Sequence, residues 1–256
     1  LMIFSQPLWA AEGISENNTL IEQQYDEINE IPDGYDNIIY ESNDEGSYSS
    51  LEELINTNSV IELDKDYSYN SNTDFKLKEG IQIKKTVVID GKGFAINSTD
   101  EAKLFDVNSK GDLTLKNIVL LNYNPTSASA INNIGKLTFD NVTFTTQKEV
   151  SAGNIQAAII NDGTFNVKNS NFANSIINCS GNGILYVYGL LIKNSKNLII
   201  ENTNITNNGI LAKASTVQIQ GGMIYNSGKL SLDNVNMSTS FSNVKASISM
   251  VFGFIL

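Results

Sequence analysis

The chain has 256 residues, of which 41% are hydrophobic, which is enough for one domain with a core and a tail. It contains no histidine, and all 17 of its basic residues are lysines, which excludes a histidine proton shuttle and an arginine clamp on anions. Fifteen of the 28 acidic residues and none of the lysines lie in residues 1–64, so the net charge of −11 belongs to the N-terminal quarter. The remainder is nearly neutral. A nucleic-acid partner is not expected, because phosphate binding needs a clustered basic face.

The first 48 residues are expected to precede the folded domain. Residues 1–11 resemble the end of a signal peptide's apolar core, with cleavage expected after Ala10 or Ala11, so we predict an extracellular protein. A stray apolar N-terminus is the alternative interpretation. Residues 12–48 are acidic and lack hydrophobic periodicity, which predicts a largely disordered linker. Cys179 is the single cysteine, so an internal disulfide is excluded.

A folded domain is expected over residues 49–246. Ser50 and Glu53 form a capping-box pattern that predicts a short helix through about Asn56. An amphipathic helix at this place would cover the open end of a solenoid. Strand-like apolar runs follow at 60–63, 81–83, 86–89 and 94–96. The apolar stretch 247–256 is too short to cross a bilayer, and is either one more coil cut short or part of an anchor.

From residue 111 onward the chain repeats one short phrase that ends in asparagine. Three examples are Gly-Asp-Leu-Thr-Leu-Lys-Asn at 111–117, Gly-Lys-Leu-Thr-Phe-Asp-Asn at 135–141 and Gly-Thr-Phe-Asn-Val-Lys-Asn at 163–169. The closing asparagines are Asn117, Asn141, Asn169, Asn202 and Asn234. Each phrase alternates apolar and polar residues, which is typical of a half-buried strand. Repeat spacings of 24 to 33 residues indicate stacked supersecondary units.

The best-formed repeat predicts three strands, at 158–161, 164–169 and 170–174, with glycine and asparagine at the corners between them. Three strands per turn that all run the same way make an all-β fold, a parallel β-helix with a short N-terminal capping helix; the right-handed form is what the resemblance described below implies. Two apolar columns should then fill the core. They are Leu113, Leu137, Phe165, Leu198 and Leu230, and beside them Leu115, Phe139, Val167, Ile200 and Leu232.

The closing asparagines should stack in the same way as the core columns. We expect each amide to hydrogen-bond the asparagine of the next coil, in a ladder buried enough to protect the acceptor site at Asn141 from glycosylation. The residues just before the asparagines point outward, and they are Lys116, Asp140, Lys168, Glu201 and Asp233. The first four alternate in sign, which would favour the correct register; chance on a solvated face is the alternative.

The coil phrase at 158–172 resembles the repeats of right-handed β-helix adhesin-like proteins of methanogenic archaea, which are related in pattern to chlamydial polymorphic outer-membrane proteins. The segments at 51–67 and 81–96 are similar to the N-terminal start of that group. The resemblance covers roughly residues 49–240. It implies a fold of the pectin-lyase-like superfamily, together with secretion, surface display and adhesion.

Catalysis on a polysaccharide, by a pectin-lyase-like lyase or a glycoside hydrolase, is the alternative function. The resemblance to those enzymes would call for an arginine base with calcium-binding aspartates or for a Gly-His-Gly turn, and the chain has neither arginine nor histidine. A carboxylate pair is the remaining route, with Asp140, Asp162 and Asp233 as candidates on turns of separate coils. We therefore predict no catalytic residues and no cofactor.

A metal site is not predicted either. Asp100, Glu101 and Asp106 form a loose acidic group, but calcium takes six to eight oxygens from a tight loop. These residues are interpreted as solvated turn residues.

One surface feature predicts ligand binding. In the run Ile-Leu-Tyr-Val-Tyr-Gly the inward positions fall to Leu185 and Val187, so Tyr186 and Tyr188 lie together on the outer face. Paired exposed aromatics can stack on sugar rings or anchor a protein; the alternative is that a loop at 176–183 covers them. The leading hypothesis is a secreted, cell-surface, non-catalytic binding or spacer module. It would be monomeric, with surface glycans or proteins as partners and no membrane insertion by the β-helix.

Overall fold

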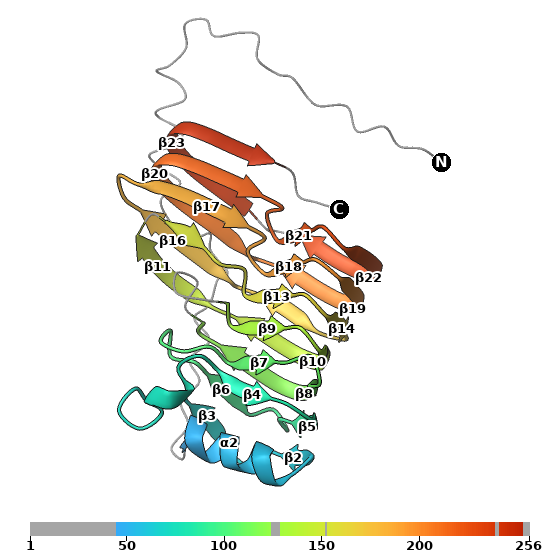
Figure 1. Cartoon of the computed structure of the whole chain (residues 1–256). Helices are drawn as coiled ribbons and strands as arrows, with labels where there is room; N and C mark the ends of the chain where they lie inside the picture. Colours follow the sequence, from blue (N-terminus) through green and yellow to red (C-terminus); the bar gives the residue numbers. More distant parts are fainter. Residues whose placement is uncertain (1–44, 124–128, 152, 239–240, 253–256) are drawn as a thin grey trace, which may run out of the picture. The chain divides into compact units, whose positions relative to one another are not determined.

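The computed structural model describes residues 45–123, 129–151, 153–238 and 241–252. Within them the strands form three parallel sheets that stack as a β-solenoid of about six turns (Figure 1). The parallel β-helix predicted from the repeats is therefore confirmed. The expected signal-peptide remnant at 1–11 and all but the last four residues of the expected linker at 12–48 lie outside the described residues.

Sheet A is the largest sheet and contains the repeated phrases. Its strands are β1 (Glu45–Ser47), β2 (Val60–Glu62), β3 (Asp66–Ser68), β5 (Thr86–Asp90), β6 (Ala95–Asn97), β8 (Asp112–Leu121), β10 (Lys136–Thr145), β14 (Thr164–Lys168), β15 (Asn171–Ala173), β19 (Asn197–Thr206) and β22 (Lys229–Ser238). The long strands bend at a closing asparagine. In the coil of β14 and β15 that asparagine, Asn169, separates two strands.

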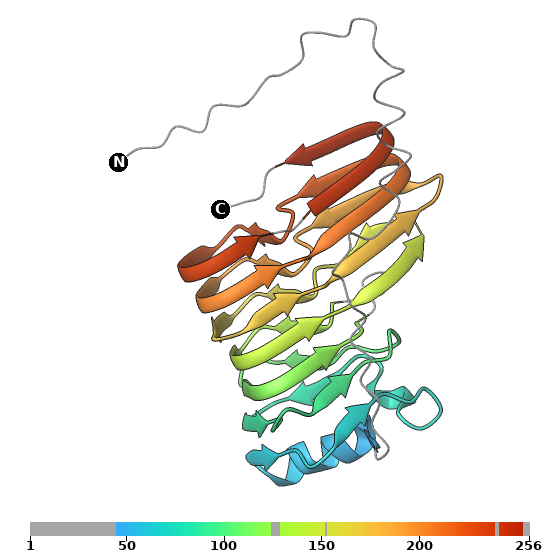
Figure 2. The ribbon, with the colours of Figure 1, turned by 180° about the vertical axis from the view of Figure 1, so that it is seen from behind.

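Sheet B continues each turn from Ile81 onward, and sheet C completes the turns from Gln147 onward. Sheet B contains β4 (Ile81–Ile83), β7 (Phe105–Val107), β9 (Ile131–Asn133), β13 (Ile159–Asn161), β18 (Ile192–Asn194) and β21 (Ile224–Asn226). Sheet C contains β11 (Gln147–Ser151), β12 (Asn154–Ile155), β16 (Ile176–Ser180), β17 (Ile184–Tyr188), β20 (Gly209–Gln220) and β23 (Phe241–Phe252). Figure 2 shows the same stack from behind. Because β23 pairs with β20, residues 247–252 of the apolar C-terminal stretch belong to a strand.

The predicted core columns are confirmed by the register of sheet A. Leu137 pairs with Leu113 on one side and with Phe165 on the other, and Leu198 continues the column. Parallel strands lie ~4.8 Å apart, so each column is a continuous apolar stack. Its members are fully buried up to β19 and only partly buried in β22, because β22 pairs on one side alone within the described residues. Burial of apolar area in these columns is the main source of stability.

The closing asparagines occupy the corners of sheet A and form only part of the predicted ladder. All five have a positive φ, between 47° and 58°, a left-handed conformation that asparagine tolerates better than most residues. Asn141 donates to Asn117 at 2.8 Å and Asn234 to Asn202 at 2.8 Å, whereas Asn169 donates to Asp140.

The prediction that this ladder is buried is wrong, because all five asparagine side chains are exposed. A left-handed corner turns its side chain away from the core. The acceptor site at Asn141 is therefore accessible, contrary to expectation.

A second asparagine column, which the sequence analysis missed, is the buried one. It consists of Asn133, Asn161, Asn194 and Asn226 at the ends of the sheet B strands, and we refer to it as the inner ladder. Successive amides are joined by hydrogen bonds of 2.7, 2.6 and 2.6 Å. The first three are fully buried, and each also donates to a backbone carbonyl at the corner that leads into sheet A. The inner ladder thus satisfies buried polar backbone groups that would otherwise cost stability.

A helix, α2 (Tyr48–Thr57), covers the N-terminal end of the solenoid (Figure 1). The predicted capping box at Ser50 and Glu53 is wrong, since the helix begins three residues earlier with Ser47 as its N-cap. A buried carboxylate from a distant turn, Asp74, accepts hydrogen bonds from the backbone N–H groups of Tyr48 and Ser49. Asp74 immediately precedes η1 (Phe75–Leu77), a short 3₁₀ turn.

Candidate functional site

The two tyrosines predicted to bind a ligand lie on β17 with the expected orientation. Leu185 and Val187 are fully buried, while Tyr188 is 38% exposed and Tyr186 is partly exposed. Ile184 precedes them on the same outward side and is 44% exposed. The alternative of a covering loop at 176–183 is wrong, because most of that segment is β16, a strand paired between β11 and β20.

A third tyrosine, missed from the sequence, joins them. Tyr225 of β21 meets Tyr188 edge to face, with ring centroids 5.8 Å apart and an interplanar angle of 82°. Two glycines with positive φ, Gly189 and Gly221, make this close approach of sheets C and B possible. A Cβ on Gly189 would lie closer than 3.0 Å to the carbonyl oxygen of Ile192 and the backbone nitrogen of Tyr225. We refer to Ile184, Tyr186, Tyr188 and Tyr225 as the tyrosine patch.

The three aspartates considered for catalysis are not brought together. The carboxylate of Asp140 lies 3.1 Å from the ammonium nitrogen of Lys168, and Asp162 accepts a hydrogen bond from the Ser195 hydroxyl at another corner. Asp233 lies in register with Glu201 on the neighbouring strand, so this corner places two carboxylates side by side. The predicted alternation of charge is present in register from Lys116 to Glu201 and ends there.

The loose acidic group at Asp100, Glu101 and Asp106 does not converge on a metal site. Asp106 lies on β7 and accepts a hydrogen bond of 3.1 Å from Gln82, whereas the other two precede that strand in a turn. Over the described part of the chain, no three acidic, cysteine or histidine side chains are grouped as a metal site requires.

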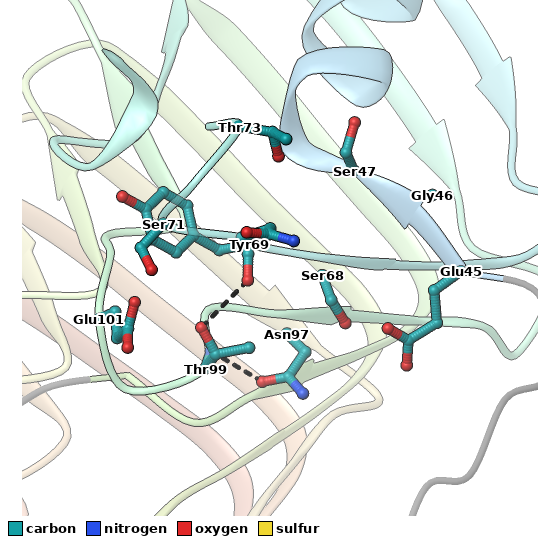
Figure 3. Close-up of a pocket in the computed structure, with 11 residues that line it drawn as sticks. Glu45, Gly46, Ser47, Ser68, Tyr69, Ser71, Thr73, Asn97, Thr99 and Glu101 are labelled. Carbon is teal, nitrogen blue, oxygen red and sulfur yellow. Dashed lines mark hydrogen bonds between the residues drawn. The ribbon is translucent and has the colours of Figure 1, made fainter. Parts of the chain in front are cut away.

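A polar pocket of about 460 Å³ lies near the N-terminal end of the solenoid (Figure 3). It is lined by Glu45, Gly46, Ser47, Ser68, Tyr69, Asn70, Ser71, Thr73, Asn97, Thr99 and Glu101. Figure 3 shows the two glutamates on opposite sides, with Ser68, Asn97 and Thr99 between them. Burial raises the pKa of Tyr69, and the nearby charges of Glu101 and Asp74 raise it further.

The chemistry of this pocket is that of hydrogen bonding to a polar ligand, since hydroxyl, amide and carboxylate groups line it. Thr99 already closes part of the wall, through a backbone hydrogen bond of 2.9 Å to Asn97 and a side-chain bond of 3.3 Å to the Tyr69 carbonyl. Sequence reasoning missed the pocket because its residues come from three separate segments, 45–47, 68–73 and 97–101.

The comparisons with known proteins do not assign a family. No protein-family model, curated protein or solved structure matches the chain. Among the described residues, no helix is both long enough and apolar enough to span a membrane.

Proposed function

We propose that the chain is a secreted, adhesin-like β-helix protein of the cell surface that binds its partner through the tyrosine patch without catalysing a reaction. The observation that carries this proposal is the edge-to-face pair of Tyr188 and Tyr225 on the outside of the solenoid. The repeat phrases at 158–172, which resemble archaeal adhesin-like repeats, and the signal-like residues at 1–11 support secretion and display.

The tyrosine patch suits this role because its rings are held on rigid elements. Tyr186 and Tyr188 alternate with buried residues of β17, and that strand pairs with β20 along its whole length. Tyrosine offers a large apolar face and a hydroxyl at low cost in side-chain entropy, so such rings recur as anchors in binding surfaces. A sugar ring or an apolar side chain would lie against the exposed faces.

The test is binding of the purified protein to a glycan array and to whole cells. We expect replacement of Tyr186, Tyr188 and Tyr225 by alanine to reduce affinity at least tenfold, since anchor residues each contribute more than about 1 kcal/mol. Phe75→Ala is the matched control, because Phe75 is an aromatic residue 61% exposed on η1, outside the patch. Blank arrays and blank cells would contradict adhesion and leave a passive spacer.

A polysaccharide-active enzyme remains the second candidate, on the strength of one observation. Glu201 and Asp233 lie in register on adjacent strands, so two carboxylates project from neighbouring positions on one face. A retaining glycosidase uses a carboxylate pair ~5–5.5 Å apart. Release of reducing ends from a polysaccharide, abolished by Glu201→Gln, would support this function. Absence of such release across neutral and acidic polysaccharides would contradict it.

A further inference from the structure

The corner between sheets B and A carries a groove that the tyrosine patch does not include. It has a volume of about 410 Å³ and is lined by residues from four turns. These are 109–111, 134–136, 162–164 and 196–197, which connect β7 to β8, β9 to β10, β13 to β14 and β18 to β19. Because the flanking strands pair in register, the four turns stack one on another (Figure 1). The groove lined by these turns therefore crosses four successive coils.

The floor of the groove is bare backbone. Gly111, Gly135 and Gly163 occupy the same position in successive turns. A Cβ on Gly135 would lie closer than 3.0 Å to the Gly111 carbonyl oxygen, and one on Gly163 would lie equally close to that of Gly135. Side chains are thus excluded at these three positions by the packing of turn on turn, and the side chains that line the groove come from the positions beside them.

The walls of the groove are basic. Six lysines are distributed over three adjacent positions of this corner in five of the six coils, and we refer to them as the lysine corner: Lys84, Lys85, Lys110, Lys136, Lys196 and Lys229. All of them except Lys85 are exposed. The same positions carry two acids, Asp112 and Asp162. The coils therefore gather lysines that are dispersed in the sequence, where no basic cluster is evident.

Part of this charge is uncompensated. Lys136 forms an ion pair of 3.1 Å with Asp112, and Asp162 accepts a hydrogen bond from Ser195. Lys110 and Lys196, which line the groove, form no ion pair with any residue that the structure describes. An exposed row of like charges raises the local concentration of anions.

We propose that the lysine corner binds a linear anionic polysaccharide along the groove. The groove is long and shallow, which suits a polymer, and the ~4.8 Å rise per coil is close to the length of one sugar ring. Ser109, Thr164 and Asn197 add hydroxyl and amide groups for sugar hydroxyls. A single-stranded nucleic acid is disfavoured, because its binding relies on aromatic stacking platforms and no aromatic residue lines the groove.

The lysine corner and the tyrosine patch lie on either side of the strands of sheet B. Lys193, an exposed lysine at the centre of β18, lies in register with Tyr225 of β21, and both belong to the narrow sheet B that separates the two surfaces. The inference names an acidic sugar polymer as the ligand class of the proposed binding protein, and in that respect it rests on the proposed function.

The experiment measures binding of the full chain to alginate, a carboxylated polysaccharide, with neutral dextran and poly(dT) as comparison polymers. The test variant replaces Lys110, Lys136 and Lys196 by glutamine. The control variant replaces the same number of exposed lysines outside the groove, Lys76, Lys78 and Lys213. Circular dichroism confirms that both variants are folded.

We expect the wild-type protein to bind alginate, and its affinity to fall as salt rises from 50 to 200 mM. The test variant should bind at least tenfold more weakly than the wild type, and the control variant should bind with unchanged affinity. Binding absent, or reduced equally in both variants, would overturn the proposal. Tighter binding of poly(dT) through the same lysines would overturn it in favour of nucleic acid. Loss of cell binding in the tyrosine variant, with no alginate binding, would leave the proposed function standing. Alginate binding that depends on the lysines, together with unchanged cell binding in the tyrosine variant, would support the lysine corner and contradict binding through the tyrosine patch.

Discussion

Replacing Asn161 by alanine should destabilise the fold strongly, because this amide is the centre of the inner ladder. Its side-chain nitrogen donates to Asn194 at 2.6 Å and to the Asn197 carbonyl at 2.9 Å. Its oxygen accepts from Asn133 at 2.7 Å and from the backbone of Gly163 at 3.3 Å. Asn161 itself is fully buried, so water cannot replace these partners.

The magnitude follows from the groups left behind. A buried donor or acceptor without a partner costs ~1–3 kcal/mol. A partner of Asn161 that keeps another hydrogen bond after the substitution should cost an amount near the lower end of this range. We expect a loss of about 3–4 kcal/mol in the free energy of unfolding. Urea unfolding followed by far-ultraviolet circular dichroism measures it. With a slope of about 2 kcal/mol/M, the midpoint should fall by roughly 1.5–2 M.

Asn141→Gly is the matched control, since it removes one of the exposed closing asparagines of sheet A instead. Asn141 is exposed and has a φ of 58°, which glycine adopts freely, and it loses one bond of 2.8 Å to Asn117. Its cost should stay below about 1 kcal/mol. An Asn161→Ala variant no less stable than Asn141→Gly would refute the reasoning that burial of the inner ladder supplies the stability.

Three further changes test other contacts. Asp74→Asn should cost about 1–2 kcal/mol at pH 7. Burial alone would raise the pKa of Asp74, but its hydrogen bonds lower the pKa, so the wild-type protein loses this contribution as the carboxylate is protonated below about pH 4. In thermal melts from pH 3 to 7 the variant should therefore lose less stability below about pH 4 than the wild type. Gly135→Ala should cost about 1–3 kcal/mol in urea unfolding because of carbonyl clashes, and Gly153→Ala, with nothing within 4 Å, should be neutral. Asp233→Lys should stabilise by about 0.2–1 kcal/mol, an effect weakened by salt, by turning repulsion from Glu201 into attraction; an unchanged melting temperature at low salt would contradict this.

Much of the fold could be predicted because the repeated phrase fixes a register. Once Asn117 and Asn141 are aligned, alternation places Leu113 over Leu137 and sets every inward residue between them. The role of the asparagines was harder to predict, because asparagine serves equally as a left-handed corner and as a ladder member. The buried role belongs to Asn133 and Asn161, each two residues before a glycine, and their inward direction depends on tertiary packing.

The candidate surfaces depend on which coils become neighbours, and the sequence does not state this directly. Tyr186 and Tyr188 could be found because they alternate within one strand, whereas Tyr225 reaches Tyr188 across a corner between two sheets. The lysine corner was missed for the same reason. Likewise, the first turn of α2 donates to Asp74, which lies 26 residues from Tyr48 and has no local pattern to mark it.

The most direct test of the stacked coils is a disulfide between neighbouring turns. Thr138 and Asn166 are in register on β10 and β14, so their Cα atoms should lie ~4.8 Å apart, within the range a disulfide accepts. In a Cys179→Ala background, cysteines at these two positions should cross-link on oxidation. Cysteines at Thr138 and Lys168, two residues out of register and about 8 Å apart, should not. Cross-linking of the second pair but not the first would contradict the stacking on which the inner ladder, the tyrosine patch and the lysine corner all depend.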